Sequence, residues 1–157
     1  ASPVYFCHYY CRLRDESGDW IPFRLWNDQA QAMRTLTVSN LVIWLKARQL
    51  GMTWLALAYC LWTILFRPGG TQLLFSLREE EACELLDRLR GMFNRLPKFL
   101  QPSGACRSNG HELHLTNGSR VKAFPTNRGD SYTATLAIVD EADLVPDLDR
   151  LRGSVKP

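Results

Sequence analysis

Two short segments of the chain hold residues whose types and spacing suit the chemistry of phosphate groups. The first matches half of the phosphate-loop pattern G-x-x-x-x-G-K-[ST], which joins a strand to a helix. Gly51 stands at the second glycine and Thr53 at the hydroxyl, whereas Lys46 replaces the first glycine and Met52 replaces the lysine. The residues of this loop are Lys46, Ala47, Arg48, Gln49, Leu50, Gly51, Met52 and Thr53.

The chemistry that such a loop needs survives these replacements. Backbone N–H groups at a helix start receive phosphate oxygens, and the Thr53 hydroxyl can ligate Mg²⁺. Lys46 or Arg48 can supply the cation that is missing at Met52, because a long, flexible stem lets lysine reach the phosphates from the other end of the loop. By itself the loop is equally compatible with a solvated basic turn after a core strand.

The second segment is an apolar run, 135–139, that ends in two adjacent acids. Asp140 can hold Mg²⁺ through the water shell of the metal, and Glu141 can orient or deprotonate an attacking water. The two carboxylates can take separate roles, because adjacent residues leave a strand end in different directions. An acidic pair can also simply begin the next turn or helix. Its occurrence together with the 46–53 loop favours nucleotide hydrolysis.

The elements that must hold these segments are predicted from apolar runs and helical periodicity. Strands are predicted at 41–45, 71–77 and 135–139, the first and third buried on both faces. Helices are predicted at 24–36, at 54–66 and from Glu79 onward. Asn117-Gly118 predicts a hairpin over 111–124, and residues 1–23 are expected to form two short strands or an extended arm. Alternating strands and helices predict an α/β domain with a mostly parallel sheet.

Length and composition bound the possible functions. The chain has 157 residues, of which 46% are hydrophobic and 22% charged, enough for one domain with a core. A formal net charge of +3 does not by itself indicate nucleic-acid binding. Five dispersed cysteines suggest reduced thiols rather than a disulfide scaffold. The apolar stretch 53–66 is shorter than the roughly 20 residues of a membrane span, and we expect no signal peptide and no membrane association.

Several segments together resemble the ATPase domain of the large terminase subunit of tailed bacteriophages. They are residues 21–29, 46–54, 128–129 and 139–142. The resemblance extends from about Pro22 to Pro157 and implies a P-loop NTPase-like fold of the additional-strand type that uses ATP and Mg²⁺. Residues 24–157 are then a partial ATPase domain, preceded by an arm or hairpin at 1–23.

The resemblance also implies roles for particular residues. Some terminases carry the loop lysine at the position of Lys46, so this residue is expected to replace the missing lysine and stabilise charge. Gln29 matches a glutamine that contacts adenine, although Gln31 is close enough to confuse the choice. Arg128 matches an arginine proposed to reach the ATP of a neighbouring subunit, and Arg48 is a candidate sensor of the γ-phosphate. Thr53 and Asp140 are expected to hold Mg²⁺ and Glu141 to activate water.

The activity implied by the resemblance is ATP hydrolysis that drives double-stranded DNA into a procapsid. The expected assembly is a homo-oligomeric ring on the portal protein, with the small terminase subunit as a partner, in the host cytoplasm. The chain is expected to end before the coupling strand and the nuclease domain, which leaves a gap between 41–45 and 135–139. The alternatives are another nucleic-acid-dependent ATPase, such as a helicase-like translocase, and a nucleotide-binding assembly module without catalysis.

Overall fold

The computed structural model describes residues 2–45, 50–102, 107–128, 132–145 and 147–156. Its α-helices are α1 (Pro3–Tyr10), α2 (Asn27–Val38), α3 (Met52–Phe66), α4 (Glu79–Asn94) and α5 (Leu148–Ser154). Three 3-10 turns are η1 (Lys98–Leu100), η2 (Thr126–Arg128) and η3 (Ala142–Leu144). The strands are β1 (Arg12–Arg14), β2 (Trp20–Pro22), β3 (Thr71–Ser76), β4 (Arg107–Ser108), β5 (Glu112–His114), β6 (Arg120–Pro125), β7 (Tyr132–Thr133), β8 (Leu136–Val139) and β9 (Val155–Lys156).

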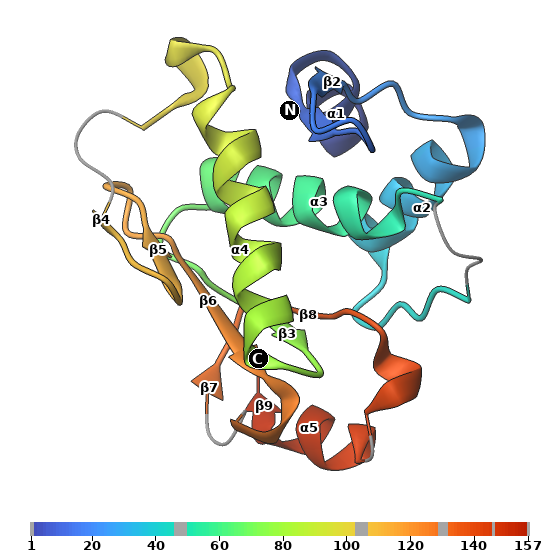
Figure 1. The fold of residues 1–157 in the computed structure, drawn as a ribbon, viewed down its shortest axis with the longest axis vertical. Helices are drawn as coiled ribbons and strands as arrows, with labels where there is room; N and C mark the ends of the chain where they lie inside the picture. The colour runs from blue at the N-terminus through green and yellow to red at the C-terminus, as the bar shows by residue number, and fades with distance from the viewer. Residues whose placement is uncertain (1, 46–49, 103–106, 129–131, 146, 157) are drawn as a thin grey trace.

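The main sheet has the strand order β4-β5-β6-β3-β8 (Figure 1). β3 pairs in parallel with β6 on one side and with β8 on the other, so that Phe75 is opposite both Phe124 and Val139. β4 and β5 add an antiparallel hairpin at the far edge. The carboxyl ends of β6, β3 and β8 therefore meet at one edge of the sheet. These pairings confirm the α/β class and the parallel centre of the sheet.

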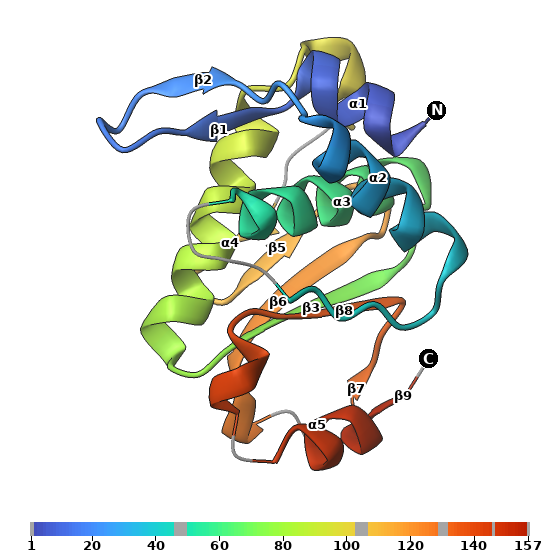
Figure 2. The same cartoon turned by 90° about the vertical axis from the view of Figure 1, so that its right-hand side faces the viewer.

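The sheet separates two layers (Figure 2). Successive side chains of a strand point to opposite faces, so Leu74 joins the large core under α3 and α4, whereas Leu73 and Phe75 face the other side. There they pack with Leu151 of α5 in a smaller cluster. α3 is apolar nearly all round because it lies between the sheet and the helices α1, α2 and α4. Of the helices that the structure describes, none has both the length and the apolar composition of a membrane span.

Most predicted elements are present. α3, α4, β3 and β8 occupy the expected places, and the acids at 79–81 form the first turn of α4, where they complement the helix dipole. Gly118 has φ +85°, the left-handed conformation that the Asn117-Gly118 turn between β5 and β6 requires. The predicted helix at 24–36 is α2, shifted by a few residues.

The predicted strand at 41–45 is wrong. The segment has no regular secondary structure (Figure 2). Leu41, Ile43 and Leu45 are 57%, 73% and 100% exposed. An apolar run forms a strand only where its backbone groups are paired, and β8, the edge of the described sheet, pairs with β3 alone. The expected gap between strands at 41–45 and 135–139 stays a prediction, because the first of the two strands does not form.

The prediction of an extended conformation is also wrong for the first ten residues. Pro3–Tyr10 form α1, in which Pro3 stands at a position where its missing N–H costs nothing. Phe6 and Cys7 of this helix are buried in the same core as α3. The two short strands around Ser17 are present as the β1–β2 hairpin. A domain boundary at residue 23 stays a prediction.

The described cysteines have free thiols, in agreement with the expectation of reduced cysteines. They are Cys7, Cys11, Cys60 and Cys83. Cys60 lies in the middle of α3, where burial raises the pKa of its thiol to about 12. The fifth cysteine, Cys106, lies outside the described residues.

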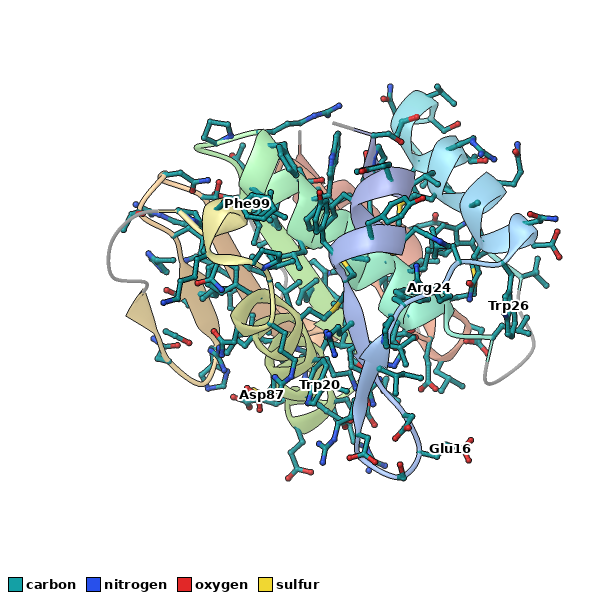
Figure 3. All side chains as sticks on the ribbon, turned by 90° about the horizontal axis from the view of Figure 1, so that it is seen from above. Glu16, Trp20, Arg24, Trp26, Asp87 and Phe99 are labelled. Carbon is teal, nitrogen blue, oxygen red and sulfur yellow. The ribbon has the colours of Figure 1, made fainter. Side chains whose placement is uncertain are left out.

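The β1–β2 hairpin is attached to α4 through Trp20 (Figure 3). The indole fills the space above Gly91, where an added Cβ would lie 2.2 Å from the ring. The guanidinium of Arg95 lies over the same ring, 4.0 Å from its centroid. Trp54 of α3 meets Trp20 edge-on at 5.8 Å between centroids. The hairpin thus packs against Trp54, the residue that follows Thr53.

Replacing Gly91 with alanine should destabilise the protein although alanine is the better helix former. The added methyl must displace Trp20, and overpacking of this kind costs about 1–3 kcal/mol, more than the gain in helix propensity of about 1 kcal/mol. The matched control is Gly153→Ala in α5, where an added Cβ meets nothing within 4 Å. In urea unfolding, Gly91→Ala should have a lower free energy of unfolding than the unsubstituted chain. Gly153→Ala should have the same free energy of unfolding or a higher one. Equal stabilities of the two variants would contradict this packing.

Candidate functional site

A cavity of about 270 Å³ lies where the carboxyl ends of β3 and β8 face the beginning of α3. In parallel α/β sheets this edge is where ligands bind. Most of the lining side chains are polar. They are Thr53, Ser76, Glu81, Glu84, Leu85, Arg88, Asp140 and Glu141.

Thr53 and Asp140 meet in this cavity although 87 positions separate them in the chain. The hydroxyl Oγ1 of Thr53 lies 3.2 Å from Oδ1 and 3.3 Å from Oδ2 of the carboxylate. Thr53 is in the first turn of α3, and Asp140 directly follows β8. The Asp140 N–H donates to the carbonyl of Phe75 at 2.9 Å, which continues the pairing of β8 with β3 by one residue. The structure thus brings together the two residues that were expected to hold Mg²⁺.

Glu141 lies beside Asp140 in an unusual backbone conformation. Its φ of 52° and ψ of 45° are left-handed, a region that side chains with a Cβ rarely adopt. The residue caps η3, where its carbonyl accepts the Leu144 N–H at 2.9 Å. Both Asp140 and Glu141 line the cavity. Strained backbone of this kind is concentrated at functional sites.

Sequence reasoning missed Ser76 at the end of β3. Its hydroxyl donates to Oε2 of Glu81 at 3.0 Å, and the same oxygen accepts the Arg78 N–H at 3.2 Å, which caps α4. Its position at the carboxyl end of a predicted strand was a usable signal, because that is where sites of parallel sheets form.

Arg88 is a second cavity residue that was not predicted. It projects from α4, is hydrogen-bonded through Nε to Glu84 at 3.1 Å, and stacks 5.5 Å from the centroid of the Trp54 ring. No local sequence signal marks it, because its approach depends on how α4 packs beside α3. Among the described lining residues it is the one cation beside four carboxylates. Such a cavity favours a bound cation.

The start of α3 is the structural counterpart of the predicted phosphate loop. Gly51 is the N-cap of the helix, with φ +66°, and among the described residues no side chain caps the first turn. Met52 is the first residue of α3. Amide groups at an uncapped helix start are suited to binding an anion.

Gln29 lies close to this point, in the first turn of α2. Its Nε2 donates to the Leu50 carbonyl at 2.9 Å, and its Oε1 accepts the Trp26 N–H at 3.0 Å. Gln31, the alternative, is exposed on the same helix.

For the remaining predicted site residues, the structure describes no side chain. Lys46, Ala47, Arg48 and Gln49 lie outside the described residues. The backbone of Arg128 closes η2, and its side chain is outside the description.

The site therefore lies in a mixed α/β domain with a parallel centre to its sheet, where a hydroxyl-bearing helix start meets an acid-ended strand at one edge. No family model matches the sequence. Among solved structures, the chain is similar to the large terminase of bacteriophage HK97, with a TM-score of 0.76 and 20% identity over 98% of this chain. It is also similar to the large terminase ATPase domain of Thermus phage P74-26, with a TM-score of 0.56 and 16% identity over 69% of this chain.

A mutant of the P74-26 domain gives the same TM-score with 17% identity over 68% of this chain. The chain spans 34% of the HK97 chain and 52–55% of the P74-26 chains. These likenesses confirm that the fold is that of phage large terminase ATPase domains.

The left-handed backbone of Glu141 predicts a stability difference between two substitutions. Glu141→Gly and Glu141→Ala both remove the carboxylate, but only glycine adopts this conformation without strain. The glycine variant should therefore be more stable than the alanine variant by about 1 kcal/mol. Urea unfolding of the two variants measures the difference directly. An alanine variant as stable as the glycine variant would mean that residue 141 is not held in this conformation.

Proposed function

We propose that the cavity binds ATP with Mg²⁺ and hydrolyses it, and that the chain is the ATPase part of a phage DNA-packaging motor. The observation that carries the proposal is the contact between the Thr53 hydroxyl and the Asp140 carboxylate. A helix start that can receive phosphates is brought by this contact beside two carboxylates at a strand end. Phosphoryl transfer from a nucleotide needs this combination.

The oxygen donors in the cavity fit Mg²⁺ rather than a softer metal. Mg²⁺ prefers oxygen ligands and usually keeps several waters, with one or two carboxylates from the protein. Within the described residues no group of three or more His, Cys, Asp or Glu side chains is arranged to hold a metal. Thr53 and Asp140 would therefore hold the ion together with water and phosphate oxygens. When bound, the ion neutralises charge on the phosphates.

The other residues would act on the phosphates and on water. The amides at the start of α3 would bind phosphate oxygens, with Lys46 supplying the positive charge that Met52 cannot. Arg48 is the alternative source of this charge. Glu141 would orient the attacking water and accept its proton. Arg128 of a neighbouring subunit would offset charge on the transferred phosphoryl group.

The proposed context is translocation of double-stranded DNA into a procapsid by a ring of subunits on the portal protein, with the small terminase subunit, in the host cytoplasm. Support comes from the structural similarity to the large terminase of bacteriophage HK97 and to the large terminase ATPase domain of Thermus phage P74-26. Met52 argues against a helicase-like translocase, in which a standard lysine is expected. A nucleotide-binding assembly module remains the second candidate, favoured by the same absence of lysine from the usual position.

Hydrolysis separates the motor from the assembly module. The chain should release phosphate from ATP in the presence of Mg²⁺, and Glu141→Gln should lower kcat by about 10²–10⁴-fold, because an amide cannot accept the proton of water. Asp143→Asn, which alters an exposed acid of the adjacent η3, is the matched control and should leave kcat unchanged. Full turnover by Glu141→Gln would contradict its proposed role. Binding of Mg²⁺–ATP without any hydrolysis would favour the assembly module.

A further inference from the structure

Gln29 joins two separate parts of the chain through its carboxamide. The bond from the Trp26 N–H to Oε1 closes the first turn of α2, as a side chain at the third helical position often does. The bond from Nε2 to the Leu50 carbonyl instead reaches a residue 21 positions away. Only 6% of Gln29 is exposed, although the neighbouring Trp26 indole lies on the surface (Figure 3).

The second bond lies at the point where the chain turns into α3. Leu50 precedes Gly51, whose left-handed conformation begins the helix that carries Thr53. The two segments are packed closely here, since a Cβ added at Gly51 would lie 3.2 Å from Nε2 of Gln29. The position of the Leu50 carbonyl therefore influences the direction of the first amides of α3 and the place of the Thr53 hydroxyl.

The geometry points to Gln29 as a positioning residue that fixes the Leu50–Gly51 backbone and thereby the phosphate end of the site, rather than as a reader of the nucleotide base. A carboxamide recognises adenine by offering its donor and its acceptor to one edge of the base. Here the donor is bonded to Leu50, the acceptor is bonded to Trp26, and the group is almost fully buried. Nε2 keeps a second hydrogen and Oε1 a second lone pair, but the group is almost fully buried, so it would have to move out of these two contacts to present its edge to adenine.

This inference rests on the proposed nucleotide binding, and it makes a different prediction from base recognition. Substituting a residue that positions the helix start should weaken the binding of every ligand that carries a triphosphate. Substituting a residue that recognises adenine should weaken the binding of ATP and leave the affinity for the other ligands unchanged.

The experiment compares Gln29→Met with Gln31→Met, an exposed control on the same helix, in the full chain. Binding of ATP, GTP and inorganic tripolyphosphate is measured in the presence of Mg²⁺. Gln29→Met removes both bonds and leaves the Leu50 carbonyl at the helix start unpaired, so it should weaken binding of all three ligands by a similar factor of about tenfold. Gln31→Met should bind all three as the unsubstituted chain does. A loss confined to ATP, or no loss at all, would overturn the inference.

Hydrogen exchange without nucleotide separates this inference from the proposed function. Gln29→Glu keeps an acceptor for the Trp26 N–H but cannot donate to the Leu50 carbonyl. In the Gln29→Glu variant, the amides in the first turn of α3 should exchange several-fold faster than the same amides in Gln31→Met. They include the Leu55 N–H, which donates to the Gly51 carbonyl. Unchanged exchange would overturn the inference. If the unsubstituted chain binds no triphosphate but exchange still accelerates in Gln29→Glu, the proposed function fails and the structural role of Gln29 stands.

Discussion

The parallel pairing of β3 with β8 is the constraint on which the rest of the site depends. It aligns Gln72–Phe75 with Leu136–Val139, and the bond from the Asp140 N–H to the Phe75 carbonyl carries the alignment to the strand end. The acids of one strand and the hydroxyl of Ser76 on the other consequently share one edge of the sheet. No local property of the 140–141 segment would place its carboxylates there.

The hydrophobic core supplies the second half of the geometry by holding α3 above that edge. Leu55, Leu57, Leu61 and Ile64 are fully buried, and burying each such side chain contributes about 1.5–3 kcal/mol. This packing fixes the axis of α3 and therefore the height of Thr53 over the strand ends. The cavity itself is less favourable for folding, because it gathers four carboxylates and includes the strained backbone of Glu141. Strained backbone held in place by its surroundings is concentrated at functional sites.

Elements with a clear apolar or turn pattern were predictable from the sequence. In these elements, the conformation that the residues favour locally is also the one that strand pairing and burial stabilise. The apolar α3, the amphipathic α4 and the Asn117-Gly118 turn are of this kind. The strand at 41–45 was mispredicted because apolar character cannot provide a pairing partner. Prediction failed at α1 because its aromatic and polar residues fit several conformations. Arg88 and the bonds of Gln29 arise from packing between segments distant in sequence, which no single-sequence pattern encodes.

In the proposed function, Thr53 and Asp140 together hold one metal–nucleotide complex. A double-mutant cycle tests it most directly, with the affinity for Mg²⁺–ATP measured calorimetrically for Thr53→Ala, Asp140→Asn, the double variant and the unsubstituted chain. If both side chains act on one ion, the double variant loses less affinity than the sum of the single losses, with a coupling of about 0.5–3 kcal/mol. Strictly additive losses, or single variants that bind as tightly as the unsubstituted chain, would contradict the account.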